Sequence, residues 1–235
     1  MELLYIIVGL VFVNNFVLAQ FLGLCPFIGV SKKSSDAFGM GLAVIFVMAM
    51  ASFFTFTINE FFIRAGGQNV FYSLAGTLGH AKAQKFIHEK GLSEVLTTGV
   101  FILVIAGFVQ FIELVIRKTS RGLYDALGIY LPLITTNCTV LGVTLLNMKN
   151  LQPGGDWTKM AFGEGLLWAT LSGLFAGVGF SMVMMLMSGI RERLAVSKLP
   201  KAFQGAPIAF ICTGMMALAF LGFTGMIGGL KANLG

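Results

Sequence analysis

The sequence predicts an all-α integral membrane protein with six transmembrane helices, arranged as two inverted three-helix repeats whose first and fourth helices are discontinuous. Of its 235 residues, 57% are hydrophobic and 11% are charged, and the mean hydropathy of +0.88 lies well above that of soluble domains. Apolar stretches long enough to cross a hydrocarbon layer of about 30 Å recur along the chain. They run over residues 3–30, 37–62, 96–116, 126–147, 162–189 and 206–229. A third observation is an internal sequence repeat.

The first apolar stretch is longer than one straight crossing needs. Between Glu2 and Lys32 lie only uncharged residues, and Gly23 and Pro26 flank Cys25 within them. Glycine and proline both weaken a helix, proline because it lacks a backbone donor. The stretch is therefore predicted to be a broken helix, with Cys25 at the break.

The second and third stretches, 37–62 and 96–116, are uninterrupted and are predicted to be straight helices. Between them lies a polar insertion over residues 65–95, which carries His80 and His88. Two histidines alone are weak evidence for a metal, so a solvated helix in an extra-cytoplasmic loop is the preferred interpretation.

The fourth stretch, 126–147, contains an unusually polar run. Gly128 and Pro132 precede Thr135-Thr136-Asn137-Cys138. Polar side chains and unpaired backbone groups are tolerated at membrane depth where they line a site inside protein. This helix is predicted to be broken as well, and the fifth and sixth stretches are predicted to be continuous.

Two blocks of sequence recur in the same order. CPFIGVS at 25–31 matches CTVLGVT at 138–144, and FGMGL at 38–42 matches FGEGL at 162–166. Each half, 1–116 and 117–235, contains three crossings, so the second copy should be inverted in the membrane. The alternative is that small residues recur simply because they let membrane helices pack closely.

The basic residues predict the orientation. The loops after the first, third and fifth helices hold nine of the sixteen lysines and arginines, and should face the cytoplasm. These nine residues are Lys32, Lys33, Arg117, Lys118, Arg121, Arg191, Arg193, Lys198 and Lys201. Both termini should then be extra-cytoplasmic. Because the positive charge is explained by the bilayer, no nucleic-acid partner is expected.

Cys25 and Cys138 occupy equivalent positions in the two copies, and three uses are open to such a pair: packing, a disulfide or metal ligation. Cys212 has no counterpart and is assigned to packing. Ligation accounts best for the polar residues beside the pair. Thiolates hold iron-sulfur clusters, usually four to a cluster. The missing two would come from another polypeptide, most simply a homologue with the same paired cysteines.

Several stretches resemble a known family. VNNFVLAQFLGLCPFIGVSKK (13–33), RKTS (117–120), GIYLPLITTNCTVLGV (128–143) and IRERLA (190–195) resemble the A subunit of the Rnf complex. That complex is the ion-translocating ferredoxin:NAD oxidoreductase of bacterial and some archaeal membranes. The equivalent E subunit of the sodium-translocating NADH:quinone oxidoreductase is a close relative and the nearest alternative.

The resemblance implies a multi-pass protein of the cytoplasmic (inner) membrane that pairs with an inverted homologue, the Rnf E subunit. Each would give two cysteines to one intramembrane 2Fe-2S cluster, here Cys25 and Cys138. Electrons passing through this cluster would drive Na⁺ or H⁺ across the membrane. Flavins, NAD and the other iron-sulfur clusters would lie on other polypeptides, the B, C, D and G subunits among them, and ferredoxin and NAD would be reached through the complex. The chain would thus be part of an enzyme without holding a complete active site.

A secondary transporter, or a structural scaffold, is the alternative from another functional class, because inverted repeats with broken helices are typical of transporters. Iron content separates these alternatives from a protein that carries a cluster. The acidic residues near the predicted helix ends do not indicate an ion path, since each has an interfacial explanation. They are Glu60, Glu113, Asp125 and Glu164.

Overall fold

The computed structural model describes residues 7–59, 93–119, 133–134, 137–151, 162–197, 200 and 203–223. These residues form helices joined by turns, with no strand among them, as the sequence predicts. The elements are a short π-helix η1 (Gly9–Val13) and the α-helices α2 (Leu24–Val30), α3 (Ser34–Ile58), α6 (Ser93–Thr119), α9 (Cys138–Leu151), α10 (Phe162–Val196) and α11 (Ala206–Leu221).

Each described helix overlaps one of the predicted apolar stretches, but the structure does not confirm six membrane spans. Two of them, α3 with 25 residues and α10 with 35, are long and apolar enough to cross a membrane. α10 begins where it was predicted to begin, at Phe162, and continues past residue 189 to Val196. Shorter apolar helices cover Phe101–Phe111, Cys138–Asn147 and Ala206–Leu221.

The break predicted in the first stretch is present, because η1 ends at Val13 and α2 begins at Leu24. The matching break in the fourth stretch cannot be compared in the same way. There α9 begins at Cys138, and residues 126–132 and 135–136 lie outside the described residues. The predicted insertion over 65–95 also lies outside them, except for the first residues of α6, and so do both termini.

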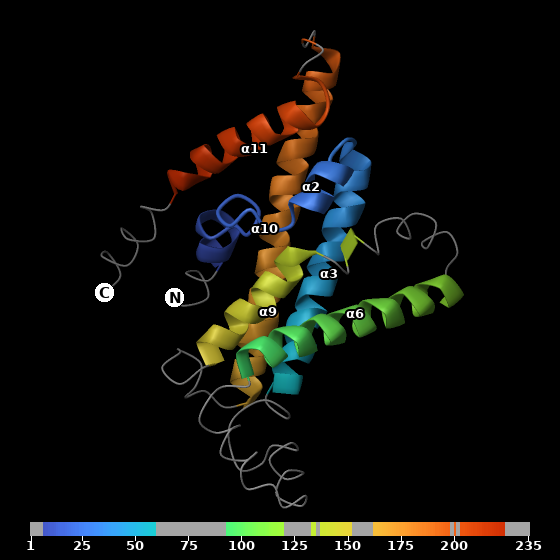
Figure 1. Ribbon diagram of the computed structural model, residues 1–235, viewed down its shortest axis with the longest axis vertical. Coiled ribbons are helices and arrows are strands. Elements are labelled where there is room, and N and C mark those ends of the chain that lie inside the picture. The colour runs from blue at the N-terminus through green and yellow to red at the C-terminus, as the bar shows by residue number, and fades with distance from the viewer. Residues whose placement is uncertain are drawn as a thin grey trace, which may run out of the picture.

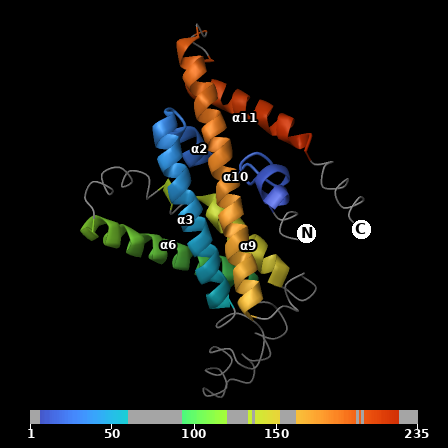
Figure 2. The same ribbon diagram turned by 180° about the vertical axis from the view of Figure 1, so that it is seen from behind.

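The centre of the molecule is the pair α3 and α10, which run side by side along its long axis (Figure 1, Figure 2). Gly41 approaches Ser181, and Gly165 approaches Phe56, so the two helices are antiparallel. Small residues line their contact, as in other membrane helix pairs. A Cβ added at Gly177 would lie only 2.7 Å from the Cα of Ile45, which means that the two backbones are nearly in contact.

The other helices pack around this pair. α9 contacts both α3 and α10, and Asn147 on α9 donates from Nδ2 to the carbonyl of Ala169 at 3.3 Å. α6 crosses α3 obliquely, and the ring centroids of Phe54 and Phe108 are 4.8 Å apart at the contact (Figure 1). α11 contacts α10. η1 packs on α10. Asn15, just after η1, donates from Nδ2 to the carbonyls of Val11 in η1 and Gly179 in α10, both at 3.0 Å. The amide at position 15 thus links η1 to α10.

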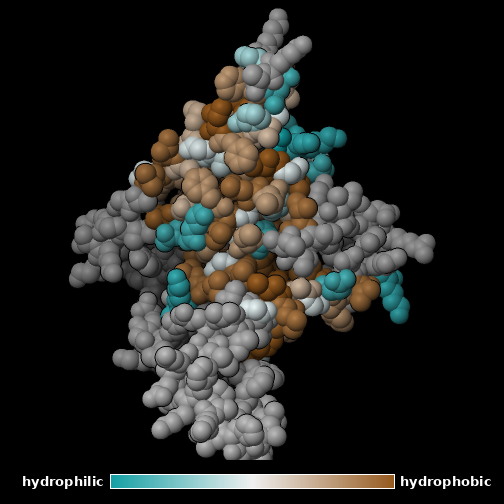
Figure 3. All heavy atoms as spheres, viewed as in Figure 1, coloured by the Kyte–Doolittle hydropathy of each residue, from teal (hydrophilic) through white to brown (hydrophobic). Residues whose placement is uncertain are grey.

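Large apolar side chains cover much of the described surface on the face seen in Figure 3. On α6 and α11 the most exposed are Leu103 (73%), Leu218 (71%) and Met215 (66%). Such a surface would be unfavourable in water, and it suits lipid or the apolar faces of other membrane proteins.

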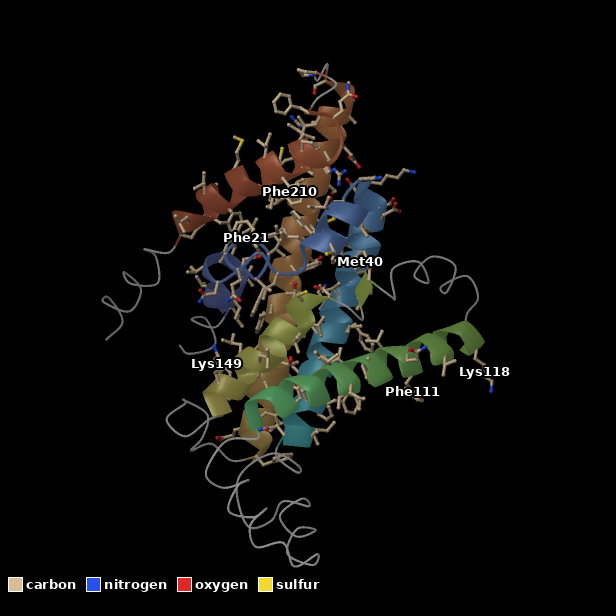
Figure 4. The ribbon with its side chains drawn as sticks, in the orientation of Figure 1. Phe21, Met40, Phe111, Lys118, Lys149 and Phe210 are labelled. Atoms are coloured by element: carbon tan, nitrogen blue, oxygen red, sulfur yellow. The ribbon has the colours of Figure 1, made fainter. Side chains whose placement is uncertain are left out.

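Two of the three basic loops lie at the same end of the molecule. The end of α10 bonds to both sides of the turn that contains Lys32 and Lys33, because Arg191 donates to Ser31 Oγ and Glu192 accepts from the Ser34 N–H. Lys118, at the end of α6, does not lie beside them, because α6 is tilted away from the α3–α10 pair (Figure 4). The loops after the first and fifth stretches thus lie together, and the side of the membrane that they face stays a prediction.

Candidate cysteine site

Cys25 is the second residue of α2, immediately after the break in the first apolar stretch. The chain enters α2 through two residues with positive φ, Phe21 at 54° and Gly23 at 75°. Figure 4 shows Phe21 in this connection. Only glycine adopts such a φ without strain, and Gly23 therefore allows the sharp change of direction that starts α2.

Gly23 also permits a close approach between the two cysteine segments. A Cβ at this position would collide with the Thr139 hydroxyl and would lie 2.7 Å from Asn137 Oδ1. Asn137 and Thr139 are the two neighbours of Cys138 in the sequence. The backbone that leads to Cys25 is therefore packed directly against the residues that flank Cys138.

The two segments run antiparallel. A Cβ at Gly29, beyond Cys25, would meet Leu133 at 3.9 Å, and one at Gly142, beyond Cys138, would meet Leu22 at 2.8 Å. Residues after one cysteine thus face residues before the other. This register brings Cys25 and Cys138 to the same level of the molecule.

Both cysteines are exposed on the surface of the chain, and the three cysteines form no disulfide. Among the described residues, no group of three or more His, Cys, Asp and Glu side chains is placed to hold a metal ion. The disulfide considered from the sequence is therefore absent. A metal centre at Cys25 and Cys138 would need ligands from outside the described part of the chain.

Two buried polar groups beside Cys138 have no hydrogen-bond partner. They are Nδ2 of Asn137, which is 3% exposed, and Oγ1 of Thr139, which is fully buried. Asn137 Oδ1, by contrast, accepts from the Thr139 backbone N–H at 3.0 Å, which caps the start of α9. Buried polar groups without partners are rare in folded proteins, and each calls for an explanation such as a redox role or a missing ion.

The far end of the cysteine helix α2 is held by α10. Arg191 Nη1 donates to the carbonyl of Ile28 at 2.6 Å and to Ser31 Oγ at 3.0 Å. The next residue, Glu192, accepts from both N–H and Oγ of Ser34 at 2.8 and 2.7 Å, at the first residue of α3. The helix dipole stabilises a cation at a helix C-terminus, such as Arg191 at α2, and an anion at an N-terminus, such as Glu192 at α3.

Comparison with known protein families identifies the family to which the chain belongs. A family model described as "Rnf-Nqr subunit, membrane protein" matches residues 3–227. The chain belongs to the Rnf-Nqr family. The family resemblance drawn from the sequence is thereby confirmed.

Individual Rnf-Nqr relatives match over nearly their whole length. The chain is 44% identical over 226 residues to the A subunit of the Na(+)-translocating ferredoxin:NAD(+) oxidoreductase complex of Acetobacterium woodii, covering 96% of this chain and 98% of the relative. It is 46% identical to the A subunit of the ion-translocating oxidoreductase complex of Serratia proteamaculans, with the same coverage. It is 47% identical over 224 residues to the protein of that name from Sodalis glossinidius, covering 95% and 97%.

In this Rnf-Nqr chain the third cysteine has a different environment. Cys212 lies in α11, is partly buried and packs against the main hydrophobic cluster. This position agrees with its assignment to packing. Cys212 is therefore a suitable control for substitutions at Cys25 and Cys138.

Sequence reasoning missed the role of Arg191 and Glu192, since Arg191 counted there only as a loop charge. The signal that could have found them is their place directly after the apolar part of the fifth stretch, where a charged side chain can reach the neighbouring helix ends. Arg191 orders the turn that follows Cys25.

We expect Arg191→Met to loosen α2, because the substitution leaves the Ile28 carbonyl without its charged donor. The cost should be about 1.5–3 kcal/mol, the range for a hydrogen bond to a charged group. Hydrogen exchange should show faster exchange in Leu24–Val30. Arg193→Met is the matched control, since Arg193 is exposed on the same helix, and equal exchange in both variants would contradict the capping role.

Proposed function

We propose that the chain is the A subunit of an Rnf-type ion-translocating ferredoxin:NAD oxidoreductase, with Cys25 and Cys138 giving half of the ligands of an intramembrane 2Fe-2S cluster. The relatives from Acetobacterium woodii and Serratia proteamaculans are named as the A subunits of such complexes. Their close match over almost the whole chain supports the same role here, in the cytoplasmic (inner) membrane. The chain is then part of a redox-driven translocase for Na⁺ or H⁺.

One observation carries the cluster proposal: the close contact of Gly23 with Asn137 and Thr139, which brings the two cysteine segments together at one level. Both cysteines are exposed there, so a second polypeptide can reach them. Cys138 is the first residue of α9 and Cys25 the second residue of α2, so both thiols lie at helix starts. These features fit a thiolate-bound cluster.

The residues around the cysteines would hold them in place. Arg191 fixes the end of α2, the side-chain Oδ1 of Asn137 caps α9, and Gly23 lets the two segments meet. When bound, the cluster would supply one-electron transfer inside the membrane. Thiolate ligation usually takes four cysteines per cluster, so a homologous partner, the Rnf E subunit, would complete the set.

The inverted repeat of residues 1–116 and 117–235 belongs to the same proposal. The FGxGL blocks at 38–42 and 162–166 make equivalent packing contacts in the two copies. Gly39 and Gly163 have no neighbour within 4 Å, whereas Gly41 and Gly165 pack on the opposite long helix. Because α3 and α10 are antiparallel, as α2 and α9 are, the equivalent helices have opposite directions. This supports a pseudo-twofold arrangement of the copies.

The remaining groups would be supplied by other polypeptides of the complex. Flavins, NAD, the other iron-sulfur clusters and the ferredoxin contact are assigned to the B, C, D, E and G subunits. This chain then contributes no complete active site and acts within the membrane.

The proposal is tested by the iron content of the purified complex. Cys25→Ser should remove about two iron atoms and the matching acid-labile sulfide, together with one paramagnetic resonance signal, because a 2Fe-2S cluster loses a thiolate ligand. Cys212→Ser should keep all three at the wild-type level. Unchanged iron in the assembled Cys25→Ser complex would support a transporter or scaffold role and would overturn the cluster assignment.

A further inference from the structure

The side-chain amide of Asn137 has one satisfied end and one unsatisfied end. Its Oδ1 accepts from the backbone N–H of Thr139 at 3.0 Å. Its Nδ2 is buried and has no hydrogen-bond partner. Two donor hydrogens are therefore closed off from solvent with nothing to accept them.

The orientation of this amide is fixed by its surroundings. Turning it end for end would place the NH₂ group against the Thr139 N–H, so that two donors faced each other. Nδ2 is therefore the atom left over. Its position is set by the capping bond of α9.

Among the other buried amides of the described residues, Asn59 also has an unpartnered atom, but that atom is the acceptor Oδ1 and not a donor. Asn15 Nδ2 donates to the carbonyls of Val11 and Gly179, both at 3.0 Å, and Asn147 Nδ2 donates to that of Ala169. A buried donor without an acceptor destabilises the folded chain. Asn137 therefore differs from its counterparts by lacking an acceptor.

The side chain that carries the unsatisfied donor is next to Cys138 in the chain, and its other end, Oδ1, packs on the backbone that leads to Cys25. Asn137 directly precedes Cys138, and its side chain meets Gly23, two residues before Cys25. The equivalent residue in the first copy is Leu24, which has no donor. The donor is thus a property of the second copy alone.

We propose that Asn137 Nδ2 donates a hydrogen bond to a ligating thiolate sulfur, Sγ of Cys25 or Cys138, and thereby raises the reduction potential of the cluster. The inference rests on the proposed function. The sulfur of a thiol is only a weak acceptor, whereas the thiolate that binds a metal is a strong one. Hydrogen bonds to ligand sulfurs stabilise the reduced, more negative cluster and are among the factors that set its potential.

A redox titration of the purified complex, followed by paramagnetic resonance, tests this inference. In Asn137→Leu, which installs the residue of the first copy, the ratio of oxidised to reduced cluster at a fixed potential should rise about tenfold. For a one-electron couple, this equals a shift of about 59 mV to more negative potential. The same substitution at Asn147, whose Nδ2 already has a partner on α10, should leave the potential unchanged.

Asn137→Asp covers the case in which the leucine variant does not fold. It keeps an oxygen for the Thr139 N–H and removes the NH₂ group, so its potential should shift in the same direction. A third measurement needs no variant. Pulsed paramagnetic resonance on wild-type complex labelled with ¹⁵N-asparagine should detect a nitrogen coupled to the cluster.

A wild-type potential in either Asn137 variant, or the absence of asparagine coupling in the wild type, would overturn the inference. If the chain did not bind a cluster at all, a different measurement would show it. In that case the Cys25→Ser complex would keep its full iron content and signal. Loss of the cluster in cysteine variants together with unchanged potentials in Asn137 variants would reject only the role of Asn137.

Discussion

Cys138→Ala is expected to abolish ferredoxin-dependent NAD⁺ reduction by the complex while leaving the complex assembled. The proposed cluster is an obligatory electron carrier and would lose one of its ligands from this chain. The cysteine is exposed, so its truncation should change the stability of the chain by no more than about 0.5 kcal/mol. Turnover in membrane vesicles, normalised to the amount of assembled complex, measures the effect.

The control for this experiment is Cys212→Ala. Cys212 packs in α11 and should retain wild-type turnover. Normal turnover in assembled Cys138→Ala complex would contradict the ligand role of Cys138. Loss of assembly in that variant alone would instead indicate a structural role for this thiol.

The second large effect is expected at the contact between α3 and α10. In Gly177→Leu, the new side chain would have to enter the space occupied by Ile45, whose Cα lies 2.7 Å from the added Cβ. Backbone cannot move aside as a flexible side chain can. The two longest apolar helices would have to separate, at a cost near or above the upper end of the roughly 1–3 kcal/mol typical of overpacking.

Thermal denaturation in detergent measures this cost. Gly189→Leu is the matched control, because it lies on the same helix and has no neighbour within 4 Å. Gly177→Leu should denature at a clearly lower temperature than both wild type and Gly189→Leu. Equal denaturation temperatures for the two variants would mean that α3 and α10 are not in direct backbone contact.

Much of the local structure could be predicted because it depends on backbone chemistry. Gly23 and Pro26 around Cys25 predicted a break, and the chain turns there at a glycine with positive φ. The start of α10 at Phe162 and that of α11 at Ala206 were also predicted. The pairing of Cys25 with Cys138 came from the alignment of the two halves, and the contact of Gly23 with Asn137 and Thr139 agrees with it.

The contacts between helices could not be predicted, and the reason is physical. α3 and α10 are apolar on all sides, so hydrophobic periodicity does not distinguish the face that meets the partner from the face that meets lipid. Which glycine packs, Gly41 rather than Gly39, depends on the shape of the opposite helix. The same holds for Arg191, whose partners Ile28 and Ser31 lie 163 and 160 positions away in the chain.

An experimental structure of the intact complex, with iron located by its anomalous scattering, tests most directly whether this chain supplies half of a shared ligand set. We predict an iron-containing centre in contact with the sulfurs of both Cys25 and Cys138, with its remaining ligands provided by a second membrane polypeptide. Cysteines that face lipid, or that are separated from each other and from any iron, would contradict that prediction.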